Sequence, residues 1–303
     1  MDLPSPLERA PGGLCEGLDL RLKREDLHEL GAFKWRGALP TIAAYKERGA
    51  SAVVTASTGN HGAAVAWACR QLGLRAMVYA PAGASLAKLA LIDGLGAEIR
   101  LAGTDLDFAK DEGKRFAVEA SVPFFEDGVE PTQYEGYGAI ADEIADQMPE
   151  PPSAVVVPVG NGALVAGIGR TLMRRSPGTL VVGVAAKEAP VMALSYEAGH
   201  PVECSRMATF ADGLAVRVAI PEAVAAVNEV VDRMVTVSER AMAEAVGAAA
   251  RAGLRIEGAA AASLAAAARI SGIEGPIVAV VTGRNIDDAL YQRAVEQPES
   301  FPD

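Results

Sequence analysis

A lysine between two aromatic residues is the first position in this sequence that could do chemistry. Lys34 lies between Phe33 and Trp35, and Arg36 follows it. Burial against the aromatic rings and the neighbouring cation would both favour the neutral amine. A neutral amine can attack an aldehyde and form a Schiff base. The alternative is a surface lysine at the start of a helix, which is the commoner use of this residue.

Two polar turns each follow an apolar run and open a helical pattern. In Thr55–Gly62, backbone N–H groups and hydroxyls suit a carboxylate or a phosphate. In Val155–Gly167, small residues around Gly160 and Gly162 let successive N–H groups surround a phosphate. Either turn could also be a capped connection without a ligand. The second imitates a dinucleotide fingerprint, but Ala185 occupies the place where an acid should hold the ribose.

The composition indicates an acidic globular protein. The chain has 303 residues, of which 50% are hydrophobic, and a formal net charge of -11. Nucleic-acid binding needs a basic surface, so no nucleic-acid partner is expected. No apolar stretch reaches the ~20 residues that span a bilayer and no signal peptide is visible, so we expect a cytoplasmic protein without a membrane partner. The cysteines and histidines show neither a disulfide framework nor metal-ligand spacing, so no metal is expected.

The elements that must position these turns follow an α/β pattern. Apolar runs without alternation indicate strands buried on both faces, and helical patterns follow most of them, which favours mainly parallel sheets flanked by helices. Val280–Asp287 is a further strand that leads into a polar turn, and residues 296–303 resemble a solvated end. Strands are expected at 52–56, 76–80, 98–102, 154–159, 180–185, 233–237 and 277–281. Helices are expected at 62–72, 86–95, 163–175 and 239–252.

Taken in this order, the four segments resemble the serine/threonine dehydratase family of pyridoxal 5′-phosphate (PLP) enzymes. Leu22–Leu27 matches the family's K-R-E-D-L segment, and only Ala32 departs from its lysine motif G-S-F-K-x-R-G-A. Ser57–His61 matches S-x-G-N-H fully, while Ala211–Val216 and Glu257 resemble further dehydratase segments. The resemblance covers nearly the whole chain. It implies the two-domain, tryptophan-synthase-β-like PLP fold, called fold type II.

The resemblance also implies a role for each motif. Lys34 would hold PLP as a Schiff base and then act as the base at the substrate Cα. Phe33 would lie against the pyridine ring, Asn60 would bind the ring oxygen, and Thr282 would face the pyridine nitrogen. The implied phosphate ligands are Gly160, Asn161, Gly162, Ala163 and Leu164. The implied substrate carboxylate site comprises Ser57, Thr58, Gly59, Asn60 and His61.

Several residues depart from the family pattern. Asn161 and Ala163 replace glycines, and because alanine does not tolerate a left-handed backbone, the turn is expected to differ at Ala163. Tyr137 stands where dehydratases have glutamine. Metal-dependent relatives carry a glutamate where this chain has Ala185, which argues against a divalent-metal site.

The implied function is β-elimination from a β-hydroxy amino acid such as L-threonine or L-serine, giving a 2-oxo acid and ammonia. A neutral hydroxyl at Thr282 would not keep the pyridine nitrogen protonated, which favours prompt elimination over transamination. An amino-acid racemase is an alternative, with Thr58 as the second acid/base. So is a β-replacement enzyme. A catalytically silent PLP-binding protein and a nicotinamide oxidoreductase are more remote.

The resemblance implies a domain organisation as well. We expect a small α/β domain at 51–131 and a large α/β domain formed by 1–50 and 132–303, with PLP in the cleft between them. A small amino-acid substrate and a second copy of the chain, in a homodimer, are the partners that the family implies.

Overall fold

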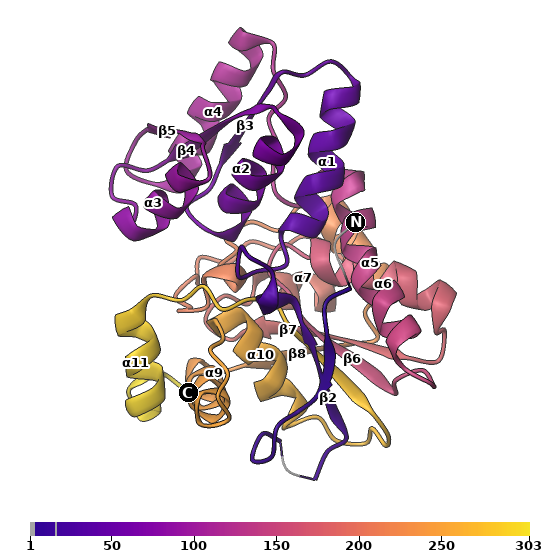
Figure 1. Ribbon diagram of the computed structural model, residues 1–303. Coiled ribbons are helices and arrows are strands. Elements are labelled where there is room, and N and C mark those ends of the chain that lie inside the picture. The colour runs from indigo at the N-terminus through magenta and orange to yellow at the C-terminus, as the bar shows by residue number, and fades with distance from the viewer. Residues whose placement is uncertain (1–3, 16) are drawn as a thin grey trace. The chain divides into compact units, whose positions relative to one another are not determined.

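The computed structural model describes residues 4–15 and 17–303, which form two compact units (Figure 1). Unit 1 combines the chain up to Phe33 with Tyr137–Asp303, and unit 2 is Lys34–Gly136. The predicted small domain, 51–131, lies within unit 2. Unit 2 also takes in the helix that follows Lys34, α1 (Trp35–Glu47), whose Trp35 ring packs edge-on against Trp67 with centroids 6.1 Å apart.

Unit 2 is built on a three-stranded parallel sheet. The order is β3 (Ala52–Ala56), β4 (Arg75–Ala80), β5 (Glu98–Leu101), with Val54 opposite Met77. Residues 52–55 of β3 are buried throughout, as expected for a strand covered on both faces. Segment 123–125 continues the sheet beside β3, because Val54 donates its N–H to Pro123 O and accepts one from Phe125. The remaining helices are α2 (Asn60–Leu72), α3 (Leu86–Gly94) and α4 (Leu106–Ala120), while α5 (Pro131–Gln147) contains the chain boundary between the units.

Unit 1 contains a six-stranded sheet in the order β1-β2-β9-β6-β7-β8. β1 is antiparallel at one edge, and the other pairs are parallel. β6 lies beside β9, with Val156 opposite Ala279, so the carboxyl ends of these two strands meet at one edge of the sheet. The strands are β1 (Leu7–Arg9), β2 (Leu20–Arg24), β6 (Ala154–Pro158), β7 (Leu180–Ala186), β8 (Arg233–Val237) and β9 (Ile277–Val281).

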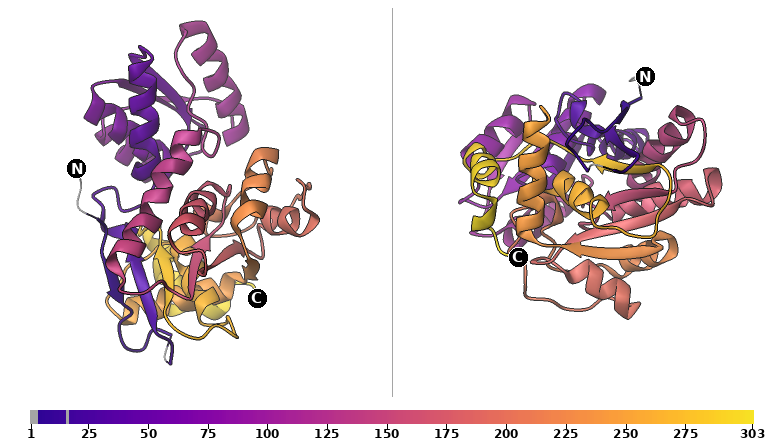
Figure 2. Two further views of the ribbon diagram at one scale, coloured as in Figure 1. Left: turned by 90° about the vertical axis from the view of Figure 1, so that its right-hand side faces the viewer. Right: turned by 90° about the horizontal axis from the view of Figure 1, so that it is seen from below.

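Helices cover both faces of the sheet in unit 1 (Figure 2). Alternate residues of β9, Ile277, Ala279 and Val281, pack with the alanine-rich α10 (Gly258–Ala267) in one core cluster. The intervening Val278 and Val280 are buried as well, so the opposite face is also covered. The other helices are α6 (Ala163–Arg175), α7 (Val191–Ala198), α8 (Pro221–Val230), α9 (Glu239–Arg251) and α11 (Asp288–Glu296), with short 3-10 turns η1 (Glu25–Leu27), η2 (Asp212–Leu214) and η3 (Pro298–Ser300).

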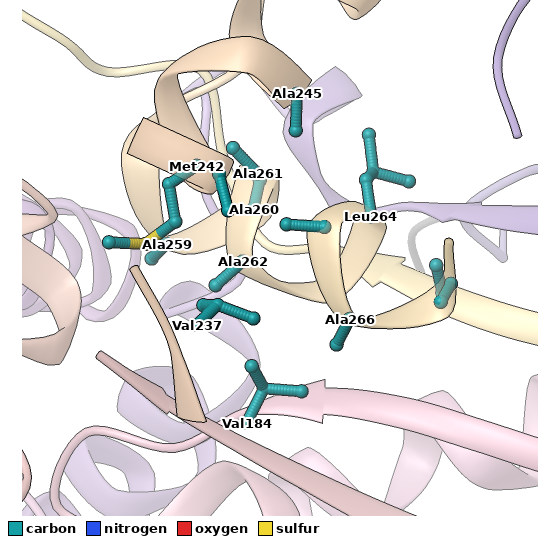
Figure 3. Packing of buried hydrophobic residues seen from close by; sticks show 14 of the residues in the cluster. Val184, Val237, Met242, Ala245, Ala259, Ala260, Ala261, Ala262, Leu264 and Ala266 are labelled. Carbon is teal, nitrogen blue, oxygen red and sulfur yellow. The ribbon is translucent and has the colours of Figure 1, made fainter. Parts of the chain in front are cut away.

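The core around α10 depends on small side chains. Every residue of α10 is buried, and Figure 3 shows its alanines beside Val184 of β7 and Val237 of β8. Alanine allows the helix to approach the sheet and α9 closely. Close packing holds the start of α10 in place, which matters for the site described below.

The α/β fold class with mainly parallel sheets is confirmed. All seven predicted strands form within one residue of their expected ends, as do three of the four helices, while α2 begins at Asn60 and not at Gly62. Residues 296–303 are mostly exposed, as expected, but Phe301 is 4% exposed and its ring packs 4.8 Å from that of Phe210. Within residues 4–15 and 17–303, no helix combines the length and apolar character that a membrane crossing requires.

Candidate functional site

Lys34 contacts a carboxylate that the sequence did not reveal. The residue caps the start of α1, and its Nζ donates a hydrogen bond to Oδ2 of Asp127 at 2.6 Å. The two side chains are 15% and 29% exposed, so this ion pair is largely withdrawn from solvent. Asp127 follows segment 123–125, and the pairing of that segment with β3 brings it near the end of the strand. The only sequence signal for it is an acid placed just after a short apolar run.

Asp127 is held in place by a small polar network. Nε2 of Gln133 donates to Asp127 Oδ1 at 2.7 Å, while Oε1 of the same glutamine accepts the N–H of Gly128 at 2.7 Å. Nδ1 of His61 lies 3.6 Å from Oδ1. Burial alone would raise the pKa of Asp127, but the charge of Lys34 and the hydrogen bonds from Lys34 and Gln133 hold it well below its usual range. Asp127 is therefore a carboxylate at neutral pH.

His61 faces the interior of unit 2. Its Nε2 lies 3.1 Å from Oγ1 of Thr55, and its ring packs edge-on to Phe125 at 4.8 Å. The Thr55 hydroxyl donates to Phe125 O at 2.8 Å, so its oxygen can accept the Nε2 proton. Burial lowers the pKa of His61 despite the attraction of Asp127, which favours a neutral ring. His61 therefore lies beside Asp127, on the side of the core.

The predicted carboxylate turn joins β3 to α2. Ser57 donates its N–H to Tyr79 O at 3.1 Å, and its Oγ accepts the N–H of Gly59 at 3.2 Å. Thr58 is half-buried, and α2 begins at Asn60, so the N–H groups of a helix start lie at this turn. Such N–H groups bind anions readily. Lys34, Asp127 and this turn all belong to unit 2.

The predicted phosphate turn lies in unit 1, between β6 and α6. Gly162 has a left-handed backbone with φ 91°, and Ala163 begins the helix. The left-handed residue of the turn is Gly162, and Ala163 takes the helical position after it, so no left-handed backbone is required of alanine. Oδ1 of Asn161 accepts the N–H of Ala163 at 3.1 Å.

Backbone N–H groups converge at this turn. In the described chain, the N–H groups of Gly160, Gly162 and Leu164 donate to no protein acceptor, and they stand at the start of a 13-residue helix. A Cβ at residue 160 would lie 2.3 Å from the carbonyl oxygen of Gly213, so the turn packs too tightly there for any side chain. Free N–H donors at the positive end of a helix dipole are suited to bind a phosphate.

Thr282 lies at the same edge of the sheet as the phosphate turn, because β9 and β6 end side by side. Its carbonyl oxygen accepts the N–H of Phe33 at 3.0 Å, which places the predicted ring-stacking residue beside it. Its Oγ1 donates to Oε1 of Glu257 at 2.9 Å. Both side chains are buried, at 1% and 6% exposure. In the sequence, Glu257 resembles part of a dehydratase segment, but that resemblance predicts no role for it.

These residues fit the chemistry of pyridoxal phosphate. An aldehyde requires an amine, which Lys34 supplies. A phosphate requires several donors, which the start of α6 offers, and an aromatic heterocycle requires an apolar neighbour and a polar partner, as Phe33 and Thr282 provide. Among residues 4–15 and 17–303, no three His, Cys, Asp or Glu side chains are grouped so that they could hold a metal ion, and Ala185 is buried in β7.

Comparison with known proteins decides the family. The model of the pyridoxal-phosphate dependent enzymes matches residues 2–283. The chain belongs to this family. It is 32% identical over 285 residues to the L-threonine ammonia-lyase of Geobacter sulfurreducens, covering 93% of this chain and 71% of that one. It is 33% identical over 284 residues to the L-threonine ammonia-lyase of Thermotoga maritima, with the same two coverages of 93% and 71%.

Solved structures of this family have the same fold. Processed threonine deaminase isoform 2 from Solanum lycopersicum superposes with a TM-score of 0.90 at 29% identity, covering 97% of this chain and 88% of that one. Maize serine racemase gives a TM-score of 0.89 at 26% identity, covering 98% and 93%. The predicted family, fold type and cofactor are confirmed. The prediction of a PLP-dependent lyase is confirmed at the level of the enzyme class.

The Asp127 ion pair predicts how stability depends on pH. The folded pKa of Asp127 lies below its unfolded value of about 3.9. Its stabilisation is therefore complete above that value and is lost as pH falls through the folded pKa. Asp127→Asn should lower the free energy of unfolding of the cofactor-free protein by roughly 1–3 kcal/mol at neutral pH. The variant and the wild type should converge in acid, as measured by denaturant unfolding at several pH values.

A matched variant isolates this effect from general loss of charge. Asp142 is 47% exposed and pairs with Arg175, so Asp142→Asn should change stability by no more than about 0.5 kcal/mol. Equal stability of Asp127→Asn and wild type at neutral pH would show that the Lys34–Asp127 pair contributes nothing.

Proposed function

We propose that the protein is a β-eliminating ammonia-lyase that converts a β-hydroxy amino acid to a 2-oxo acid and ammonia. L-threonine and L-serine are the first candidates. The observation that carries the proposal is the pairing of Lys34 with Asp127 in a chain that aligns over 93% of its length with L-threonine ammonia-lyases. When bound, PLP supplies an electron sink for negative charge at the substrate Cα.

Lys34 is proposed as the residue that holds the cofactor and then takes the Cα proton. Asp127, whose Oδ2 lies 2.6 Å from the Lys34 amine, is suited to stabilise the ammonium once the proton is at Nζ. Ser57–His61 are proposed to bind the substrate carboxylate through N–H groups and hydroxyls, with Asn60 also at the cofactor ring oxygen.

The start of α6 is proposed to hold the cofactor phosphate through the turn 160–164. Phe33 would then lie against the pyridine ring, with Thr282 at its nitrogen. The location of PLP in a cleft between two domains stays a prediction from the sequence. The cytoplasmic location and the homodimer stay predictions of the same kind.

The test is release of 2-oxo acid by the purified, PLP-loaded protein from L-threonine, L-serine and a panel of other β-hydroxy amino acids. L-threonine should give 2-oxobutanoate and L-serine pyruvate. L-alanine, which has no β-leaving group, is the control and should give no β-elimination product. Conversion of an L-amino acid to its D-isomer without 2-oxo acid would replace the proposal with a racemase, for which the half-buried Thr58 hydroxyl is available.

A further inference from the structure

Asp127 depends on Lys34 for its ion pair. Its Oδ2 accepts a hydrogen bond from Lys34 Nζ at 2.6 Å, and its Oδ1 accepts one from Nε2 of Gln133 at 2.7 Å. Nδ1 of His61 lies 3.6 Å from Oδ1, but burial lowers the pKa of that ring and favours its neutral form. In the part of the chain that the structure describes, Lys34 is therefore the one full positive charge paired with this carboxylate.

The neighbouring carboxylate, Glu126, has cations of its own. Lys110 and Lys114, both in α4, pair with it, and Lys114 Nζ lies 2.6 Å from its Oε2. These two lysines neutralise Glu126 and leave Asp127 to Lys34. Two adjacent acids in the sequence thus have separate partners, and only Asp127 is paired with the lysine that is proposed to do chemistry.

The proposed chemistry requires Lys34 to give up its positive charge. A base must be unprotonated before it can take the Cα proton, and an amine that holds the cofactor covalently is no longer an ammonium with three donors. Asp127, which is largely withdrawn from solvent, would then be a carboxylate without a cation, and such a state is unfavourable. Its charge also holds the proton on Lys34 and opposes the neutral amine. A second cation beside Asp127 would relieve both effects.

We propose that the same site accepts an amino acid with an ammonium group on Cβ, an α,β-diamino acid, and that Asp127 binds that ammonium. The proposal rests on the proposed function, in which Lys34 takes the Cα proton and Ser57–His61 bind the carboxylate. At proton transfer Nζ must lie roughly 3 Å from Cα. Oδ2 of Asp127 lies 2.6 Å from the same Nζ, so a substituent on Cβ is within its reach.

The charges are restored within one turnover. The Cα proton passes to Lys34 Nζ, the electron pair of the Cα–H bond becomes a Cα–Cβ double bond, and the Cβ–N bond breaks. Its electron pair leaves with the nitrogen, so the β-ammonium departs as neutral ammonia. Asp127 loses the substrate cation in this step and regains the ammonium of Lys34, which is the pair that the structure shows. Water then hydrolyses the remaining unsaturated amine, so 2,3-diaminopropionate and one water give pyruvate and two ammonia.

A β-hydroxyl makes the opposite demand on these residues. It leaves as water only if it receives a proton, and an ionised carboxylate has none to give. Lys34, once protonated, could supply that proton but would thereby lose its pair with Asp127. The charges around Lys34 therefore favour a β-ammonium over a β-hydroxyl as the group that leaves.

The test compares L-2,3-diaminopropionate with L-serine on the PLP-loaded protein, since both yield pyruvate. We expect the higher kcat/KM for the diamino acid, with two ammonia released per pyruvate against one from L-serine. Asp127→Asn removes the charge and keeps the shape, and it should lower the ratio of the two kcat/KM values by roughly 30-fold or more. Glu126→Gln is the matched control, because it removes the adjacent carboxylate that pairs with other lysines, and it should keep the wild-type ratio.

Binding can also be measured without turnover. L-2,4-diaminobutyrate has a side-chain ammonium but no group that can leave from Cβ, and L-2-aminobutyrate has the same carbon chain without the ammonium. The absorbance of the bound cofactor reports the affinity for each compound. The wild type and Glu126→Gln should bind the diamino compound more tightly, and Asp127→Asn should lose this preference. A merely structural role of Asp127 would weaken the binding of both compounds equally.

Two results would overturn the proposal. One is 2-oxo acid from L-serine or L-threonine with none from L-2,3-diaminopropionate, a comparison in the wild type that needs no variant to fold and that leaves the proposed function standing. The other is an unchanged preference for the diamino compounds in Asp127→Asn. Pyruvate from L-2,3-diaminopropionate alone would support the proposal and overturn the β-hydroxy substrate of the proposed function. If no compound of either class gives a 2-oxo acid, both fail.

Discussion

Lys34→Ala should reduce 2-oxo acid release by about 1,000-fold or more, since the variant has no amine to hold the cofactor or take the Cα proton. The absorbance band that PLP gains when it is covalently bound should also be absent. Both are measured on purified protein incubated with PLP, before and after removal of free cofactor. Retained turnover would reject the assignment of Lys34.

Lys46→Ala is the matched control for this change. Lys46 lies in the last turn of the same helix, α1, and donates to Leu72 O on an exposed surface. Its loss should leave turnover and absorbance close to those of the wild type. Thermal unfolding of both variants separates chemistry from folding, because Lys34→Ala also leaves Asp127 without its ammonium partner.

The chemistry-bearing turns could be predicted because each is a local feature. Ser57–His61 and the turn at Gly160 each occupy a few consecutive residues between a buried strand and a helix. Hydrophobic pattern and small residues are enough to find such a unit. Lys34 was found in the same way, from its immediate neighbours.

The partners of these residues could not be predicted, because they arrive through tertiary pairing. Asp127 is 93 positions from Lys34, and it reaches the amine only because segment 123–125 lies beside β3. Glu257 is 25 positions from Thr282 and reaches it through the packing of α10 on β9. Each partner is an ordinary acid in the sequence, and its role depends on which element lies next to it.

Three of the elements that were not predicted, α1, α10 and β2, have local reasons. α1 contains Pro40, which lacks the N–H that a helix interior uses, and α10 is apolar on all sides, so it shows no helical period. β2 carries Lys23 and Arg24, which would indicate a solvated segment. Lys23 is nevertheless fully buried, because its Nζ pairs with Glu143 at 2.6 Å and donates to Ser5 O at 2.7 Å. An ion pair such as this one offsets the cost of burying a charge, but it joins two distant segments and cannot be predicted from the sequence of either one alone.

The phosphate turn gives the second large effect, through Gly160→Ala. The added Cβ would lie 2.3 Å from Gly213 O, a backbone atom that no side-chain rotation can move. The turn must therefore move to relieve this contact. Because a hydrogen bond tolerates only small changes in its donor–acceptor distance and angle, the N–H donors of the turn then lose their alignment on the phosphate. Overpacking of this kind costs about 1–3 kcal/mol. PLP affinity should therefore fall by roughly ten- to hundred-fold.

Pyridoxal, which lacks the phosphate, tests whether the loss arises at the turn. Binding of PLP and of pyridoxal to Gly160→Ala is measured by absorbance titration alongside the wild type. Only PLP should bind more weakly to the variant, because pyridoxal makes no use of the N–H groups at the start of α6. Gly178→Ala is the control, since a Cβ at residue 178 would meet nothing within 4 Å. An equal loss of affinity for both ligands would mean that the substitution distorts the site as a whole, and unchanged PLP affinity would remove the turn from the phosphate site.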